Sequence, residues 1–196
     1  MITIKQIQSP AVVTDQGVDT NLYAGQTYTC GVPEVSEYLE LEIDTTLSGA
    51  SPSDSFWLPM LFSRITIDWG EGNGDEYIQV SGITDVSMQH QYATSGIYTV
   101  KLKGVGSFAF NNSSSYDKDK VTKIKNWGKF QHGAASNFYG CLNLTEITAT
   151  DRLIATASDM TQFFRDVPIT SIANVTFLGN GIMQETMRGT QLNEDI

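Results

Sequence analysis

The chain has 196 residues, enough to bury the core of one or two small domains, and 40% of them are hydrophobic, which excludes an intrinsically disordered protein. Only 17% of the residues are charged, and 22 acidic against 12 basic residues give a net charge of −10. An acidic surface repels phosphate groups and anionic lipids, and no apolar segment approaches the roughly 20 residues of a membrane-spanning helix, so we expect neither nucleic-acid binding nor membrane insertion.

Residues 1–35 alternate short apolar runs with turn-forming residues, which predicts an extended arm with one or two strands. The segment lacks the apolar run of a signal peptide, so the sequence predicts no export signal. We expect the arm to pack on its own chain or on a neighbour. Cys30 and Cys141 are the two cysteines, and each is expected to act as a small buried apolar residue. Whether they form a disulfide is left open.

Residues 36–104 are predicted to form an antiparallel sandwich. The Gly, Pro and Ser content of residues 48–55 indicates a loop, and the glycines of residues 70–76 indicate a tight turn. No helical period appears in this region, so the predicted fold class is mainly β. Alternation of apolar and polar side chains, typical of half-buried strands, occurs in residues 38–44, 64–70, 77–83 and 96–104.

Two segments of this region carry a family signature, IDWGEGNGDEY followed by QHQYATSGIYTVKL. They resemble the pattern of the polycystic-kidney-disease (PKD) type domain, an immunoglobulin-like sandwich, in which D-W-G-D-G precedes H-x-Y and G-x-Y-T-V. Glu71 stands where that pattern has its second Asp. The resemblance implies a structural role for His90. The matching positions are Asp68, Trp69, Gly70, Glu71, Gly72, His90, Tyr92, Gly96, Tyr98, Thr99 and Val100.

Residues 105–196 contain a repeat. Similar segments end at Ile124, Ile147, Ile172 and Ile196, at spacings of 23, 25 and 24 residues. A period of about 20–29 residues with one short strand per unit is typical of a leucine-rich-type solenoid. Each unit is expected to place its strand on a common sheet and to bury its apolar residues against the next unit.

The segment NFYGCLNLTEI, residues 137–147, resembles the M-F-x-G-C-x-x-L-T-x-I pattern of the BspA-type leucine-rich repeats of bacterial surface proteins and phage structural proteins. The second copy keeps Phe164 but has Asp166 and Val167 in place of the Gly-Cys pair. The two resemblances imply an N-terminal arm, an Ig-like or PKD-like β-sandwich and a short leucine-rich-repeat solenoid. The expected boundaries are 1–35, 36–104 and 105–196.

A weak calcium candidate lies in the Gly-rich loop, where Asp68, Glu71, Asn73 and Asp75 supply oxygen atoms. Calcium takes about 6–8 oxygen ligands, but this spacing does not match an EF-hand loop. An Asp before such a turn usually accepts hydrogen bonds from its own backbone. We expect no other cofactor. The two histidines, His90 and His132, are too far apart in the sequence to indicate a zinc site.

An apolar run follows the Ser-rich loop, in a stretch that the PKD-like pattern does not cover. It contains Phe56, Trp57, Leu58, Met60 and Phe62. The run either completes the core, which we favour, or forms an exposed contact patch.

No catalytic motif occurs, and both resemblances are to adhesive families, so we predict a non-enzymatic surface binding or assembly module. The absence of an export signal favours a virion structural protein on the virion surface, a capsid decoration or tail-associated protein bound to a shell or tail scaffold. The alternative is a bacterial cell-surface adhesin, located extracellularly, that binds a host protein or glycan through its repeat sheet. A glycan-active hydrolase would require two carboxylates about 5–10 Å apart in a cleft.

Overall fold

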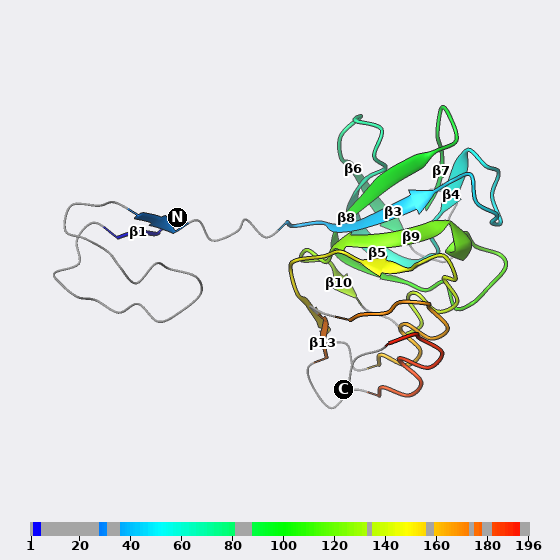
Figure 1. The fold of residues 1–196 in the computed structure, drawn as a ribbon. Helices are drawn as coiled ribbons and strands as arrows, with labels where there is room; N and C mark the ends of the chain where they lie inside the picture. The colour runs from blue at the N-terminus through cyan, green and yellow to red at the C-terminus, as the bar shows by residue number, and fades with distance from the viewer. Residues whose placement is uncertain are drawn as a thin grey trace. The chain divides into compact units, whose positions relative to one another are not determined.

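The computed structural model describes residues 2–4, 28–30, 36–80, 88–132, 135–155, 159–172, 175–177 and 182–192. These residues contain many strands and no α-helix, so the prediction of a mainly β chain is confirmed (Figure 1). The chain divides into two compact units, residues 1–35 and 36–196. In the first, β1 (Ile2–Ile4) pairs antiparallel with β2 (Tyr28–Cys30).

The second unit is built on a mixed sheet of seven strands with the order β11-β9-β3-β8-β5-β6, in which β10 also pairs with β8. Figure 1 shows β9, β3 and β8 side by side. β10 and β11 join their neighbours in parallel, and the other pairs are antiparallel. The strands are β3 (Leu39–Asp44), β5 (Met60–Asp68), β6 (Glu76–Val80), β8 (Ile97–Phe108), β9 (Val121–Asn126), β10 (Gln131–His132) and β11 (Glu146–Ile147).

The two faces of this sheet follow from the alternation of side chains along its strands. In β3, Leu39, Leu41 and Ile43 are fully buried and alternate with half-buried Glu40 and Glu42. The same alternation in β8 sends Val100 and Leu102 inward and Thr99 and Lys101 outward. One face is therefore apolar and faces the core, and the other is polar and faces solvent.

A second, two-stranded sheet contributes to the same core. It pairs β4 (Ser55–Trp57) with β7 (Gln89–Gln91). Phe56, Leu58 and Met60 are at most 1% exposed, and half-buried Trp57 packs edge-on against Tyr116 at 5.5 Å between ring centroids. Phe56, Leu58 and Met60 therefore lie in the core, and Trp57 packs against it. The side chain of Phe62 lies outside the described part of the chain.

A buried ion pair fastens the loop before β4. Asp117 accepts hydrogen bonds from the Ser51 backbone N–H (2.9 Å), the Ser51 hydroxyl (2.5 Å) and the Trp57 N–H (2.7 Å). Lys120 Nζ lies 3.8 Å from Asp117 and donates to the carbonyls of Ser51 (3.0 Å) and Ser55 (2.8 Å). Both side chains are fully buried, so each charge depends on these partners for its solvation. The loop therefore has a fixed conformation although its composition is that of a turn.

The repeat region stacks short turns through a ladder of backbone hydrogen bonds. Phe138 N–H donates to the Phe163 carbonyl (3.0 Å), and Phe164 N–H donates to the Thr186 carbonyl (2.9 Å). The Phe138 and Phe164 rings stack with centroids 5.6 Å apart, and Trp127 packs edge-on against both. Successive turns thus donate N–H groups in one direction and bury a column of aromatic rings.

The strands of the repeat region differ from the expectation. β11 pairs with β9 and aligns Ile147 with Ile124, but Ile172 lies outside any strand, and its carbonyl accepts a hydrogen bond from the Val175 N–H at 3.1 Å. β12 (Leu153–Ala155) instead pairs in parallel with β13 (Val175–Phe177) as a separate sheet. Ile196 lies outside the described residues. A solenoid sheet with one strand from every unit is therefore not what the described residues form.

The expected boundary between residues 104 and 105 falls inside β8. β9, from the predicted repeat region, pairs with β3, from the predicted sandwich. Asp151 fixes the turn after β9 by accepting hydrogen bonds from the backbone N–H groups of Trp127 (2.9 Å) and Gly128 (2.6 Å). The predicted sandwich and the predicted repeat region therefore both contribute strands to the seven-stranded sheet, and residues 36–196 form one compact unit.

Candidate functional site: a polar groove across the sheet

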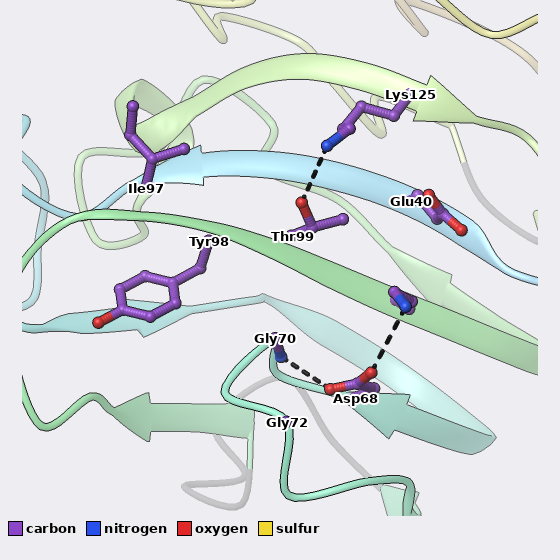
Figure 2. Close-up of a pocket in the computed structure, with 9 residues that line it drawn as sticks. Glu40, Asp68, Gly70, Gly72, Ile97, Tyr98, Thr99 and Lys125 are labelled. Atoms are coloured by element: carbon purple, nitrogen blue, oxygen red, sulfur yellow. Dashed lines mark hydrogen bonds and ion pairs between the residues drawn. The ribbon is translucent and has the colours of Figure 1, made fainter.

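An open groove of about 490 Å³ lies on the polar face of the sheet (Figure 2). Its lining residues come from strands β3, β8 and β9, from the end of β5 and from the turn that follows β5. It is lined by Glu40, Asp68, Gly70, Gly72, Ile97, Tyr98, Thr99, Lys101 and Lys125.

The strand register brings the charged residues of the groove together. Lys101 on β8 is aligned with Glu40 on β3 and with Asp68 on β5. Thr99, two residues earlier on β8, therefore points to the same face. Lys125 reaches it from β9, and its Nζ donates a hydrogen bond to Thr99 Oγ1 at 3.2 Å.

The two lysines are held loosely by carboxylates. Lys101 Nζ lies 3.7 Å from Asp68 Oδ2, and Lys125 Nζ lies 3.9 Å from Glu42 Oε2. Both distances exceed the roughly 2.7–2.9 Å of a charge-assisted hydrogen bond. Their side chains remain 38% and 39% exposed. Each ammonium group can therefore donate further hydrogen bonds to a ligand.

The turn after β5 lines part of the groove, and its conformation depends on two glycines with positive φ angles. Gly70 has a φ of +89°, and a Cβ at this position would lie 2.6 Å from the Thr99 carbonyl oxygen. Its N–H donates to Asp68 Oδ1 at 2.8 Å, which fixes the turn at the end of β5. Gly72 has a φ of +80°, and nothing lies within 4 Å of where its Cβ would be. The turn therefore packs closely against β8 at Gly70 and is open to solvent at Gly72.

A row of aromatic rings supports the groove from behind. Trp69 stacks on His90 (4.7 Å between centroids), His90 meets Tyr92 edge-on (4.6 Å), and Tyr92 stacks on Tyr98 (3.8 Å). His90 Nε2 lies 3.0 Å from Glu71 Oε2, and this hydrogen bond is the main cause that lowers the pKa of Glu71. These contacts hold Tyr98 in place and engage His90 with Trp69, Tyr92 and Glu71.

The oxygen atoms of the calcium candidate do not converge. Asp68 is bonded to Gly70, Glu71 to His90, and Asp75 to the Tyr38 hydroxyl at 2.6 Å, while Asn73 is exposed. In the described part of the chain, no three His, Cys, Asp or Glu side chains are placed to hold a metal ion. The Gly-rich loop therefore serves as a turn in this structure.

Sequence reasoning found only part of this groove. The PKD-like motif contains Asp68, Gly70 and Thr99, but the motif gave no reason to select Lys101, and Lys125 was assigned to another domain. The alternation within residues 96–104 places Thr99 and Lys101 on one face, and this was the available signal. Cys141 lies elsewhere as a free, fully buried thiol whose pKa is raised, chiefly by burial.

Comparisons with protein-family models, with characterised proteins and with solved structures found no match to this chain. Among the described residues, no helix is long and apolar enough to cross a membrane. Fold and groove together define a mainly β protein with a preorganised polar surface.

Proposed function

We propose that the protein is a non-enzymatic binding and assembly module that recognises a protein partner through the polar face of its sheet. The observation that supports this most directly is the groove itself. Charged side chains of both signs, a hydroxyl group and the exposed side chain of Ile97 are held side by side on paired strands. Such a mixture of an apolar contact and surrounding polar groups is typical of protein interfaces.

The particular setting that we propose is a virion, with the protein acting as a capsid decoration or tail-associated component. The support comes from two resemblances. Residues 68–100 resemble PKD-type domains, and residues 137–147 resemble the BspA-type repeats of bacterial surface proteins and phage structural proteins. The stacked turns bury Phe138 and Phe164 completely, which supports a stably packed component rather than a loosely folded one. The immunoglobulin-like and leucine-rich identities of the two parts belong to this proposal.

Quantitative mass spectrometry of fractions from the source tests the setting. Purified particles and the cell-envelope fraction would each be measured for copies of this protein, with a known shell protein and a known envelope protein as references. We expect a fixed stoichiometry to the shell protein in the particles. Enrichment in the envelope fraction would overturn the virion setting in favour of the adhesin, and recovery in neither fraction would overturn both.

A further inference from the structure

We infer that the groove binds an acidic segment of a protein partner, with carboxylates held by Lys101 and Lys125 and an aliphatic side chain packed on Ile97. This inference rests on the proposed binding function and names the chemistry of the ligand. Four observations lead to it: the two lysines, the carboxylates beside them, the apolar rim, and the local charge.

Among the described lysines whose side chains reach solvent, Lys101 and Lys125 have the most distant nearest carboxylates, at 3.7 Å and 3.9 Å. Lys120 is also 3.8 Å from its partner, but it is fully buried and donates to several backbone carbonyls. The remaining four have a carboxylate oxygen within 3.3 Å: Lys103 (3.1 Å), Lys118 (3.0 Å), Lys123 (3.1 Å) and Lys129 (3.3 Å). The two groove lysines are thus the exposed cations of this set with incomplete ion pairs.

Each neighbouring carboxylate uses one oxygen for another contact and turns the other oxygen toward its lysine. Asp68 Oδ1 accepts the Gly70 N–H that fixes the turn, and Oδ2 lies 3.7 Å from Lys101 Nζ. Glu42 Oε1 accepts a hydrogen bond from the Thr122 hydroxyl at 3.3 Å and lies 3.8 Å from Lys123 Nζ, and Oε2 lies 3.9 Å from Lys125 Nζ. A carboxylate from outside has no such second contact, and it is a group that an exposed ammonium binds through short charge-assisted hydrogen bonds.

The rim favours an aliphatic contact over a sugar ring. Ile97 is 66% exposed at the start of β8, beside the groove. Tyr98 is less available, because its ring stacks on Tyr92 and its hydroxyl donates to the Thr94 carbonyl at 2.6 Å. Sugar rings commonly pack on an open aromatic face, and Tyr98 does not offer one. The exposed branched side chain of Ile97 instead matches Val, Ile or Leu in a peptide.

The net charge of −10 does not prevent an acidic segment from approaching here. In physiological salt, charges farther away than about 8 Å are largely screened, so the local balance matters most. Among the lining residues, Glu40 and Asp68 balance Lys101 and Lys125, and the adjacent Glu42, 3.9 Å from Lys125 Nζ, also lies 3.8 Å from Lys123 Nζ. Because the pairs are exposed, we expect weak, salt-sensitive binding.

The test uses the full chain, labelled with ¹⁵N, and two capped peptides, Gly-Glu-Val-Glu-Gly and its neutral counterpart Gly-Gln-Val-Gln-Gly. We expect the acidic peptide to shift the amide signals of Gly70, Gly72, Thr99 and Lys101, with little effect from the neutral one. The double variant K101M/K125M should bind the acidic peptide roughly fivefold to thirtyfold more weakly. The matched control K103M/K129M removes two lysines outside the groove and should bind as the wild type does.

Equal binding of the two peptides, shifts outside the groove, or undiminished binding by K101M/K125M would overturn the inference. An oligogalacturonate titration forms a third arm, and groove shifts with this acidic glycan but not with the peptide would replace the protein ligand by a glycan. The result of the peptide titration is independent of the test of the virion setting. Particle-associated protein with a groove that ignores acidic peptides contradicts only the inference, whereas peptide binding by a protein absent from particles contradicts only the virion setting.

Discussion

Asn112 and Gly140 occupy equivalent positions in successive turns, and a Cβ atom on Gly140 would lie 2.3 Å from Asn112 Oδ1. Asp166 and Gly189 repeat the relationship, again at 2.3 Å. The backbone φ angles of these four residues are +50°, +78°, +55° and +77° respectively. An Asn or Asp side chain in one turn therefore fills the space that glycine leaves in the next. This alternation accounts for Asp166 in place of a glycine in the second copy of the repeat, and for Gly189 at the equivalent position of the next copy.

Gly140→Ala should destabilise the protein by about 2–4 kcal/mol, because it combines left-handed backbone strain with a collision against Asn112. Urea unfolding measures the change. Gly74→Ala is the matched control: φ is +87°, nothing lies within 4 Å of its Cβ position, and strain alone should cost about 1–2 kcal/mol. Equal losses for the two variants would show that the contact with Asn112 has no energetic weight.

Lys120→Met should lower the free energy of unfolding by about 3–5 kcal/mol, because it leaves the buried carboxylate of Asp117 without its cation. Chemical denaturation at neutral pH provides the measurement. Lys129→Met removes a lysine whose side chain is 64% exposed, and this control should change stability by no more than about 0.5 kcal/mol. A loss for Lys120→Met as small as that of the control would contradict a structural role for the buried pair.

Glu185 should make stability sensitive to acid. Its pKa is lowered from the ordinary 4.5 by the hydrogen bond from Gln162, and next by that from Arg188. The unfolded chain lacks these partners, so the carboxylate stabilises the folded state above pH 4.5 and this contribution is lost as the pH falls through the lower, folded pKa. We expect the Tm of Glu185→Gln to fall less than that of the wild type between about pH 6 and pH 3. Parallel Tm curves would refute this contribution.

Cys141 should resist alkylation in the folded protein. Its thiol is fully buried, and burial raises its pKa, so little thiolate is present and reagents cannot reach it. Mass spectrometry of a Cys30→Ser variant exposed to iodoacetamide isolates this thiol. We expect negligible labelling in buffer and complete labelling in denaturant, with the same urea midpoint as unfolding. Rapid labelling in buffer would show that the repeat region opens locally.

The strands of the sheet were predictable where local alternation is strong. Residues 38–44 correspond to β3 and residues 96–104 to most of β8. The strand β8 was predicted too short because Gly104 resembles a turn residue, whereas it pairs with Ile65 of β5 inside the strand. Its φ of +118° and the approach of the Arg64 carbonyl oxygen, 2.5 Å from where a Cβ would be, explain why a glycine stands there. Local patterns cannot report such a contact between distant strands.

The groove was less predictable than the strands, for the same reason. Lys125 meets Thr99 only because β9 pairs with β3 and β3 with β8, and such pairings depend on the whole sheet. The apolar run with Phe56 shows the opposite limitation. Its composition fits either a core or a contact surface, and only the position of β4 decides between them.

Because β8 continues through residue 104, the chain cannot be cut at that position without breaking the sheet. A fragment ending at Gly104 would lose the last four residues of β8 and all of β9. β3 would then become an edge strand, with one row of backbone N–H and C=O groups open to pairing with another molecule. Expressed alone, the PKD-like segment should aggregate or recruit a foreign strand. We therefore expect the smallest piece of the second unit that folds to include both sequence signatures.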